Sequence, residues 1–430
     1  TNGAVIATLN GTLNGNGYQL TLSGTSPSFN VYTVMSNLGG LTVSSGVWLL
    51  YGANTYNATT TLSGGATYLF SDQAFGTATS AGSLLMTGGV LAYSASSTRD
   101  VSSLFATSGG QNWQINTAGY NVTYATPLSG NSTLTKLGDG ILTLTGANTY
   151  SGNTTITQGT LQIAGAGSLG AGSYSGAITN NANLQYSSSS SQSLTGILSG
   201  AGVITKDTSS STLTLSGNNT YTGATNITTG TVALGSTTAL GATSMVTLSD
   251  NATLDLKGNS VTLQGIASSY TTSTIKTTGG NATLTLNNLV GVDYEYDGAL
   301  KDGVGGVLTL VKNDARALTL AGVNTYSGNT TINGGAVYLG SSTALPSTTV
   351  LTLTNSSLVD LQGNSISLQG LSSSDPYSAI MSSSGTPTLT VNISSDYRYD
   401  GQLLSTLGLT KAGTGTLSLG ASSVSGDPGS

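Results

Sequence analysis

The chain has 430 residues, of which 6% are charged, and its 10 Lys+Arg against 16 Asp+Glu give a formal net charge of −6. Cys and His are both absent, which excludes disulfides, thiolate or imidazole metal sites and Ser-His catalysis, and no cofactor is expected. No basic surface is present to neutralise phosphates, so we expect no nucleic-acid partner, and no apolar run reaches the length of a transmembrane helix. Disorder is not expected either, because the chain carries 20 Tyr and is 37% hydrophobic.

One short unit recurs along the chain. Its first copy, residues 47–69, reads VWLLYGANTYNATTTLSGGATYL, and residues 141–163 read ILTLTGANTYSGNTTITQGTLQI. Further copies are TLTLSGNNTYTGATNITTGTVAL at 212–234 and ALTLAGVNTYSGNTTINGGAVYL at 317–339, and a partial copy begins with TLSLG at 416. With their flanking residues, the recognisable repeats are 47–69, 134–164, 204–235, 308–340 and 407–420. Such regular repetition is typical of a solenoid.

Within each unit the pattern predicts three short strands separated by corners. Leu142 and Leu144 alternate with Thr143, as residues on the two faces of a strand do. The following Asn-Thr-Tyr segment is rich in turn-forming residues, because Asn tolerates positive φ and bonds to nearby backbone. We therefore predict structural corner residues at Asn54, Tyr56, Asn148, Tyr150, Asn219, Tyr221, Asn324 and Tyr326. Gly and Thr are too dense for helices.

A longer period of 105 residues is superimposed on the short one. LKGNSVTLQG at 256–265 matches LQGNSISLQG at 361–370, and YEYDG at 294–298 matches YRYDG at 397–401, 103 residues further on. Block duplication suits a solenoid, in which each coil contacts only its neighbours. We predict an all-β, right-handed parallel β-helix with roughly 18–21 coils of about 20 to 25 residues each. It would form one continuous domain over 1–430, with divergent coils at 1–45 and a flexible tail at 421–430.

The repeat from Gly138 to Ile163 resembles the autotransporter-associated β-strand repeat of bacterial passenger domains. The shared pattern is GxGTLTLTGxNTYxGxTTIxxGTLxLG, and clear matches cover about a quarter of the chain. The resemblance implies a right-handed parallel β-helix, export through the cell envelope, and display or release outside the bacterium. It implies no particular activity, although similar proteins are most often adhesins. The first residues carry no basic segment followed by an apolar core, so a mature product or a fragment is expected.

Two aromatic clusters are candidate binding sites, at residues 293–297 (DYEYD) and 396–400 (DYRYD). In a strand, alternation places the tyrosines on one face and the charged residues on the other. One hypothesis is glycan contact through Tyr294, Tyr296, Tyr397 and Tyr399. The other is structural, a strand at the rim closed by an Asp-Gly turn. A shared Ca²⁺ site is not favoured, because Arg398 replaces the counterpart of Glu295.

The resemblance implies a secreted or cell-surface protein, and we expect one that is not an enzyme. Polysaccharide-active β-helix enzymes remain an alternative, but they need several acids gathered on one face, and here the acids are scattered. Many exposed hydroxyls and amides suit weak multivalent contact with glycans or cell surfaces. A second alternative is a self-assembling subunit of an extracellular filament, sheath or surface layer, in which the chain pairs with itself end to end.

Overall fold

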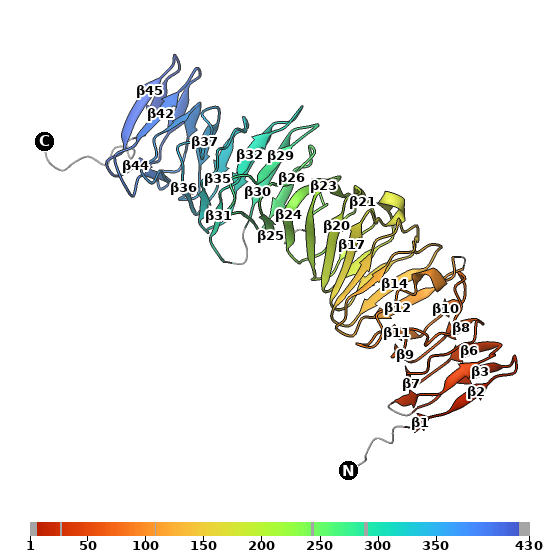
Figure 1. Ribbon diagram of the computed structural model, residues 1–430. Helices are drawn as coiled ribbons and strands as arrows, with labels where there is room; N and C mark the ends of the chain where they lie inside the picture. Colours follow the sequence, from red (N-terminus) through yellow and green to blue (C-terminus); the bar gives the residue numbers. More distant parts are fainter. Residues whose placement is uncertain (1–6, 26–27, 108, 242–244, 288–290, 421–430) are drawn as a thin grey trace, which may run out of the picture. The chain divides into compact units, whose positions relative to one another are not determined.

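The computed structural model describes residues 7–25, 28–107, 109–241, 245–287 and 291–420; the tail expected at 421–430 lies outside this part. The chain divides into two compact units, Thr1–Leu213 and Thr214–Ser430. In each unit, short parallel strands follow one another round successive coils (Figure 1). They form a β-solenoid of about 19 turns, which confirms the predicted class and number of coils.

Helical structure in the described residues is confined to two short 3-10 segments, η1 (Ser102–Leu104) and η2 (Gly170–Gly172). No helix in this part of the chain is long and apolar enough to cross a membrane.

The first unit contains four main groups of parallel strands. The longest sheet runs, in spatial order, through β1 (Ala7–Leu9), β4 (Phe29–Val31), β7 (Val47–Leu50), β9 (Ala66–Leu69), β11 (Val90–Ala92), β12 (Asn112–Asn116), β14 (Thr133–Leu137), β16 (Thr154–Ile156), β19 (Ile178–Asn180) and β22 (Leu198–Ser199). Two smaller sheets are β3 (Gln19–Leu22), β6 (Gly40–Val43), β8 (Thr60–Leu62) and β10 (Leu84–Met86), and the pair β2 (Thr12–Asn14) and β5 (Val34–Ser36). The fourth group is β13 (Val122–Tyr124), β15 (Ile141–Leu144), β17 (Thr160–Gly165), β20 (Asn183–Ser188) and β23 (Val203–Leu215), with β18 (Ser173–Tyr174) and β21 (Gln192–Leu194).

The second unit contains five groups. One holds β24 (Thr225–Leu234), β26 (Ala252–Asp255), β29 (Thr274–Thr277) and β32 (Ala299–Asp302), with β25 (Met245–Leu248) and β28 (Gly265–Ala267) beside β24. One six-stranded sheet consists of β27 (Val261–Leu263), β30 (Ala282–Leu286), β33 (Leu308–Lys312), β35 (Thr330–Ile332), β37 (Val350–Leu353) and β40 (Gly370–Ser372). A second six-stranded sheet consists of β31 (Tyr294–Tyr296), β34 (Leu318–Leu320), β36 (Ala336–Leu339), β38 (Leu358–Asp360), β41 (Ala379–Met381) and β44 (Gln402–Leu403). The last two are β39 (Ile366–Leu368), β42 (Thr388–Asn392) and β45 (Gly408–Ala412), and the pair β43 (Tyr397–Tyr399) and β46 (Leu417–Leu419).

The core of each unit is a set of columns of apolar side chains, one from each coil. In the first unit Leu142 pairs in register with Leu161, which pairs with Leu184, and all three are buried. The residues between them on each strand point outward, as the alternating burial pattern of β15 shows. This is the alternation that the sequence predicts, and burial of these columns is the main stabilising force.

Sharp corners between the strands depend on glycine at particular positions. Gly140, at the start of β15, has φ +88°, and a Cβ there would lie 2.3 Å from the carbonyl oxygen of Tyr120 in the preceding coil. No other residue fits such a close approach between coils without a shift of the backbone.

Candidate functional site

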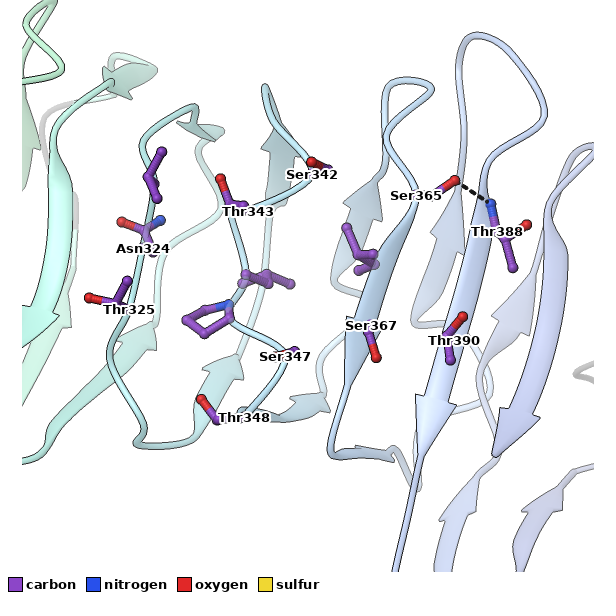
Figure 2. A pocket seen from close by; sticks show the side chains of 14 residues that line it. Asn324, Thr325, Ser342, Thr343, Ser347, Thr348, Ser365, Ser367, Thr388 and Thr390 are labelled. Carbon is purple, nitrogen blue, oxygen red and sulfur yellow. Dashed lines mark hydrogen bonds between the residues drawn. The ribbon is translucent and has the colours of Figure 1, made fainter. Parts of the chain in front are cut away.

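An open groove of about 640 Å³ crosses successive coils of the second unit (Figure 2). It is formed by the corner segment 323–325, the loop 342–348, β39 and β42. The lining residues are Val323, Asn324, Thr325, Ser342, Thr343, Leu345, Pro346, Ser347, Thr348, Ser365, Ile366, Ser367, Thr388 and Thr390. Nine of these 14 described residues are Ser or Thr, and none is ionisable. The groove therefore offers hydroxyl hydrogen bonds together with apolar contacts from Val323, Leu345, Pro346 and Ile366.

The wall of the groove at Asn324 is held by a buried side-chain amide. Its Oδ1 accepts a hydrogen bond from the Leu300 N–H at 2.7 Å, and its Nδ2 donates to the Ala344 carbonyl at 2.7 Å. Asn324 thus joins the coil before it to the coil after it. Two residues on, the Tyr326 hydroxyl lies 2.7 Å from Oγ1 of Thr330, inside the coil. These three hydrogen bonds satisfy polar groups that would otherwise be buried without partners.

The same arrangement occurs at the other Asn-Thr-Tyr corners that the sequence singles out. Each Asn side chain is buried, and each donates to a carbonyl about 20 residues further along the chain: Asn54 to Ala74, Asn148 to Ser168 and Asn219 to Ala239. Each Tyr is buried beside the Thr four residues later, in the pairs Tyr56–Thr60, Tyr150–Thr154 and Tyr221–Thr225. The Asn side chains of the motif therefore link successive coils.

Sequence reasoning missed a set of lysines in strands β14, β23, β33 and β45. In each of Lys136, Lys206, Lys312 and Lys411, Nζ donates to the carbonyl oxygen of the residue two positions later. Lys136 also donates to the carbonyl of Gln158 in the next coil, at 3.1 Å. A signal was present, because a lysine precedes four of the repeats in a chain with only 10 basic residues.

Three of these lysines are almost fully buried, namely Lys136, Lys206 and Lys312. Burial lowers the pKa of Lys136 and of Lys206 to about 8. Burial also lowers the pKa of Lys312, although its ion pair with Asp314, at 3.2 Å, acts in the opposite sense. Removing an ammonium group from water is costly, so these lysines are tolerated because backbone carbonyls surround them.

The tyrosines proposed as glycan contacts are mostly inside the solenoid. Tyr294, Tyr296 and Tyr399 are 6%, 0% and 0% exposed, and Tyr397 is half-buried. Alternation does separate the tyrosines from Asp293 and Glu295, as expected, but the tyrosines take the inner face. Tyr294 and Tyr296 pair in register with inward-facing leucines of β34. Buried rings do not offer the faces that stacking on a glycan requires.

Among the described residues, no cluster of three acidic side chains could hold a metal ion. Beside Tyr294, Asp293 bonds to the backbone instead, because it accepts a hydrogen bond from the Ala317 N–H at 2.9 Å.

Stacked parallel coils, columns of apolar residues and repeated corners define this chain as a β-solenoid repeat protein. The model of the passenger-associated-transport-repeat family matches residues 134–163, 208–234, 310–339 and 409–427. The adhesin BmaC autotransporter of Brucella suis biovar 1 (strain 1330) is 44% identical over 95 residues, which cover 21% of this chain. The chain spans 3% of the length of that relative. No solved structure matches.

These matches and the fold support an autotransporter passenger domain built with repeats, located at the cell surface or outside the cell. The first matched segment, 134–163, includes Lys136, Asn148 and Tyr150.

Proposed function

We propose that this passenger domain is a non-enzymatic adhesive scaffold whose outer surface binds neutral polysaccharide through many weak contacts. The groove between residues 323 and 390 carries this proposal. Its Ser and Thr hydroxyls donate and accept hydrogen bonds, as the hydroxyls of a sugar polymer do. Because it is open and shallow, one groove would bind weakly, and affinity would come from repeated contacts.

The chemistry of the groove favours binding over catalysis. Glycoside hydrolysis needs a pair of carboxyl groups that flank the bond to be cleaved. The described residues that line this groove are neutral, and they include neither a carboxyl group nor a basic side chain. The name of the Brucella relative agrees with an adhesive role for that protein.

The test is retention of the purified chain on a panel of immobilised neutral and charged polysaccharides at low and high salt. We expect retention on at least one neutral polysaccharide, with little change between low and high salt, because no charge contributes. Retention on charged polymers alone, or on no polymer of the panel, would contradict the proposal.

The matched variants are Thr343→Trp, which fills the groove, and Thr319→Trp, at an outward position of β34 that does not line the groove. The first should weaken retention and the second should leave it unchanged. Equal effects of the two variants would place the contact elsewhere.

A further inference from the structure

The groove has a second copy in the same unit. A depression of about 210 Å³ is lined by Asn219, Thr237, Thr238, Leu240, Ser260 and Thr262. Adding 105 to each number gives Asn324, Ser342, Thr343, Leu345, Ser365 and Ser367, all of which line the larger groove. The counterparts of Ser347 and Thr348 fall at 242 and 243, outside the described residues.

The hydrogen bonds of the two grooves also correspond. The backbone N–H of Asn219 donates to the Thr238 carbonyl at 3.2 Å, and that of Asn324 donates to the Thr343 carbonyl at 3.2 Å. In each groove, a serine hydroxyl also accepts a backbone hydrogen bond from the next coil: Ser260 from Thr283 and Ser365 from Thr388, both at 3.0 Å. The two grooves therefore share these hydrogen bonds and six lining positions, although the groove at Asn219 is the smaller.

The two copies face in different directions, because the duplicated block does not contain a whole number of coils. Following the register from Thr262, five successive pairings lead to Thr285, Val311, Thr331, Thr352 and Ser372. The counterpart of Thr262 is Ser367, which lies one strand earlier, in β39. The block thus spans five coils less one strand.

Because of this missing strand, β27 and β39 belong to different sheets. β27 begins the sheet that ends at β40, whereas β39 begins a separate sheet in which it pairs with β42, and β42 pairs with β45. With three strand directions in each coil, the second groove is turned by about a third of a revolution relative to the first. A flat surface cannot contact both grooves at once.

We infer that the second unit has two equivalent grooves that bind two separate strands of the same neutral polysaccharide, so that one chain cross-links them. This inference rests on the proposed function, since it takes the same ligand class. The two grooves together form a bridge between two polysaccharide strands or two coated surfaces, and they do not strengthen attachment to one surface.

The experiment uses the full chain and the polysaccharide of the panel that retains it best. A short oligosaccharide of that polymer gives the number of sites by calorimetry, and agglutination of polysaccharide-coated beads measures cross-linking. The variants are Thr238→Trp, Thr343→Trp and the double substitution, with Thr319→Trp as the control. Thr238 and Thr343 are exposed, so the variants should fold, which circular dichroism checks.

The wild-type chain and the control should bind two oligosaccharides and agglutinate beads. Each single variant should bind one oligosaccharide and lose agglutination at least tenfold, and the double variant should bind none. One site in the wild-type chain, or agglutination that persists in both single variants, would overturn the bridge while leaving the proposed function intact. Absence of binding to every polymer of the panel would contradict both the bridge and the proposed function. Sedimentation separates bridging by one chain from bridging by dimers, and a wild-type dimer would also overturn the inference.

Discussion

Removing the amide of Asn148 should destabilise the coils around it by about 2–5 kcal/mol. Asn148 is 1% exposed, and its Oδ1 accepts the hydrogen bond of the Leu128 N–H at 2.8 Å. In Asn148→Ala that buried N–H loses this acceptor, which costs about 1–3 kcal/mol. The Nδ2 bonds to the carbonyls of Gly146 and Ser168 are also lost, but both carbonyls keep a bond from the Asn148 N–H, so each loss costs about 0.5–1 kcal/mol.

Native-state hydrogen exchange is the assay, because opening of a solenoid can be local and one global transition need not describe it. Protection should fall in the peptides around residues 128, 148 and 168 and should stay unchanged in the second unit. The matched control is Asn153→Ala, because Asn153 is exposed and its Oδ1 accepts one surface bond, from Ala177 at 3.0 Å. Asn153→Ala should change the free energy of unfolding of these coils by no more than about 0.5 kcal/mol.

A second variant separates hydrogen bonding from the loss of volume. Asn148→Asp keeps the shape and the acceptor, but at pH 7 it places a charge inside the coil. Relative to the wild-type chain at the same pH, it should be more destabilised at pH 7 than at pH 4. If Asn148→Ala costs no more than Asn153→Ala, or if the Asp variant shows no dependence on pH, the link between coils does not depend on this amide.

Three further predictions concern the core. Lys136→Met should lower the free energy of unfolding by about 1–3 kcal/mol, because three backbone carbonyls lose their donor. Hydrogen exchange measures this loss, and the control Lys257→Met, at an exposed position, should have little effect. Urea unfolding should show stability rising between pH 8 and 10, because Lys136 and Lys206 have folded pKa values of about 8 and unfolded ones near 10.5, so the unfolded chain binds more protons. Above pH 10 stability should fall, because burial raises the pKa of tyrosines such as Tyr326 and the folded chain then keeps protons that the unfolded chain releases. Leu144→Ala should cost about 2–5 kcal/mol, with lost exchange protection centred on β13, β15 and β17, and a uniform loss over the unit would contradict nearest-neighbour coupling.

The parts of the fold that depend on local pattern could be predicted from the sequence. Alternation of Leu142 and Leu144 with Thr143 gives the strand and its two faces, and the strand is paired as a parallel coil predicts. The Asn-Thr-Tyr segment repeats at four places, so its position between strands was visible without a structure. These features depend on residues within one coil.

The groove could not be predicted, because its lining comes from segments about 20 residues apart that meet only when the coils stack. Ser365 and Thr388 face each other through the register of β39 with β42. The tyrosine clusters show the same limit: alternation separates Tyr294 from Glu295, but pairing with Leu318 decides which of them is inside. The lysines illustrate a further difficulty, since an isolated Lys in a strand is ordinarily expected in solvent.

The outward side chains are the ones available for binding, because the inward side chains pack against one another in columns between the coils. Along one sheet the inward residues Leu318, Val337 and Val359 are all apolar, while the outward residues in the same strands are Thr319 and Tyr338. Outward positions can vary without disturbing the columns, and duplication of a block then copies whatever surface has formed. When the block falls one strand short of a whole number of coils, the copied surface is moved to the next face. The length of the repeat, and not the chemistry of the groove alone, then determines whether the protein holds one surface or connects two.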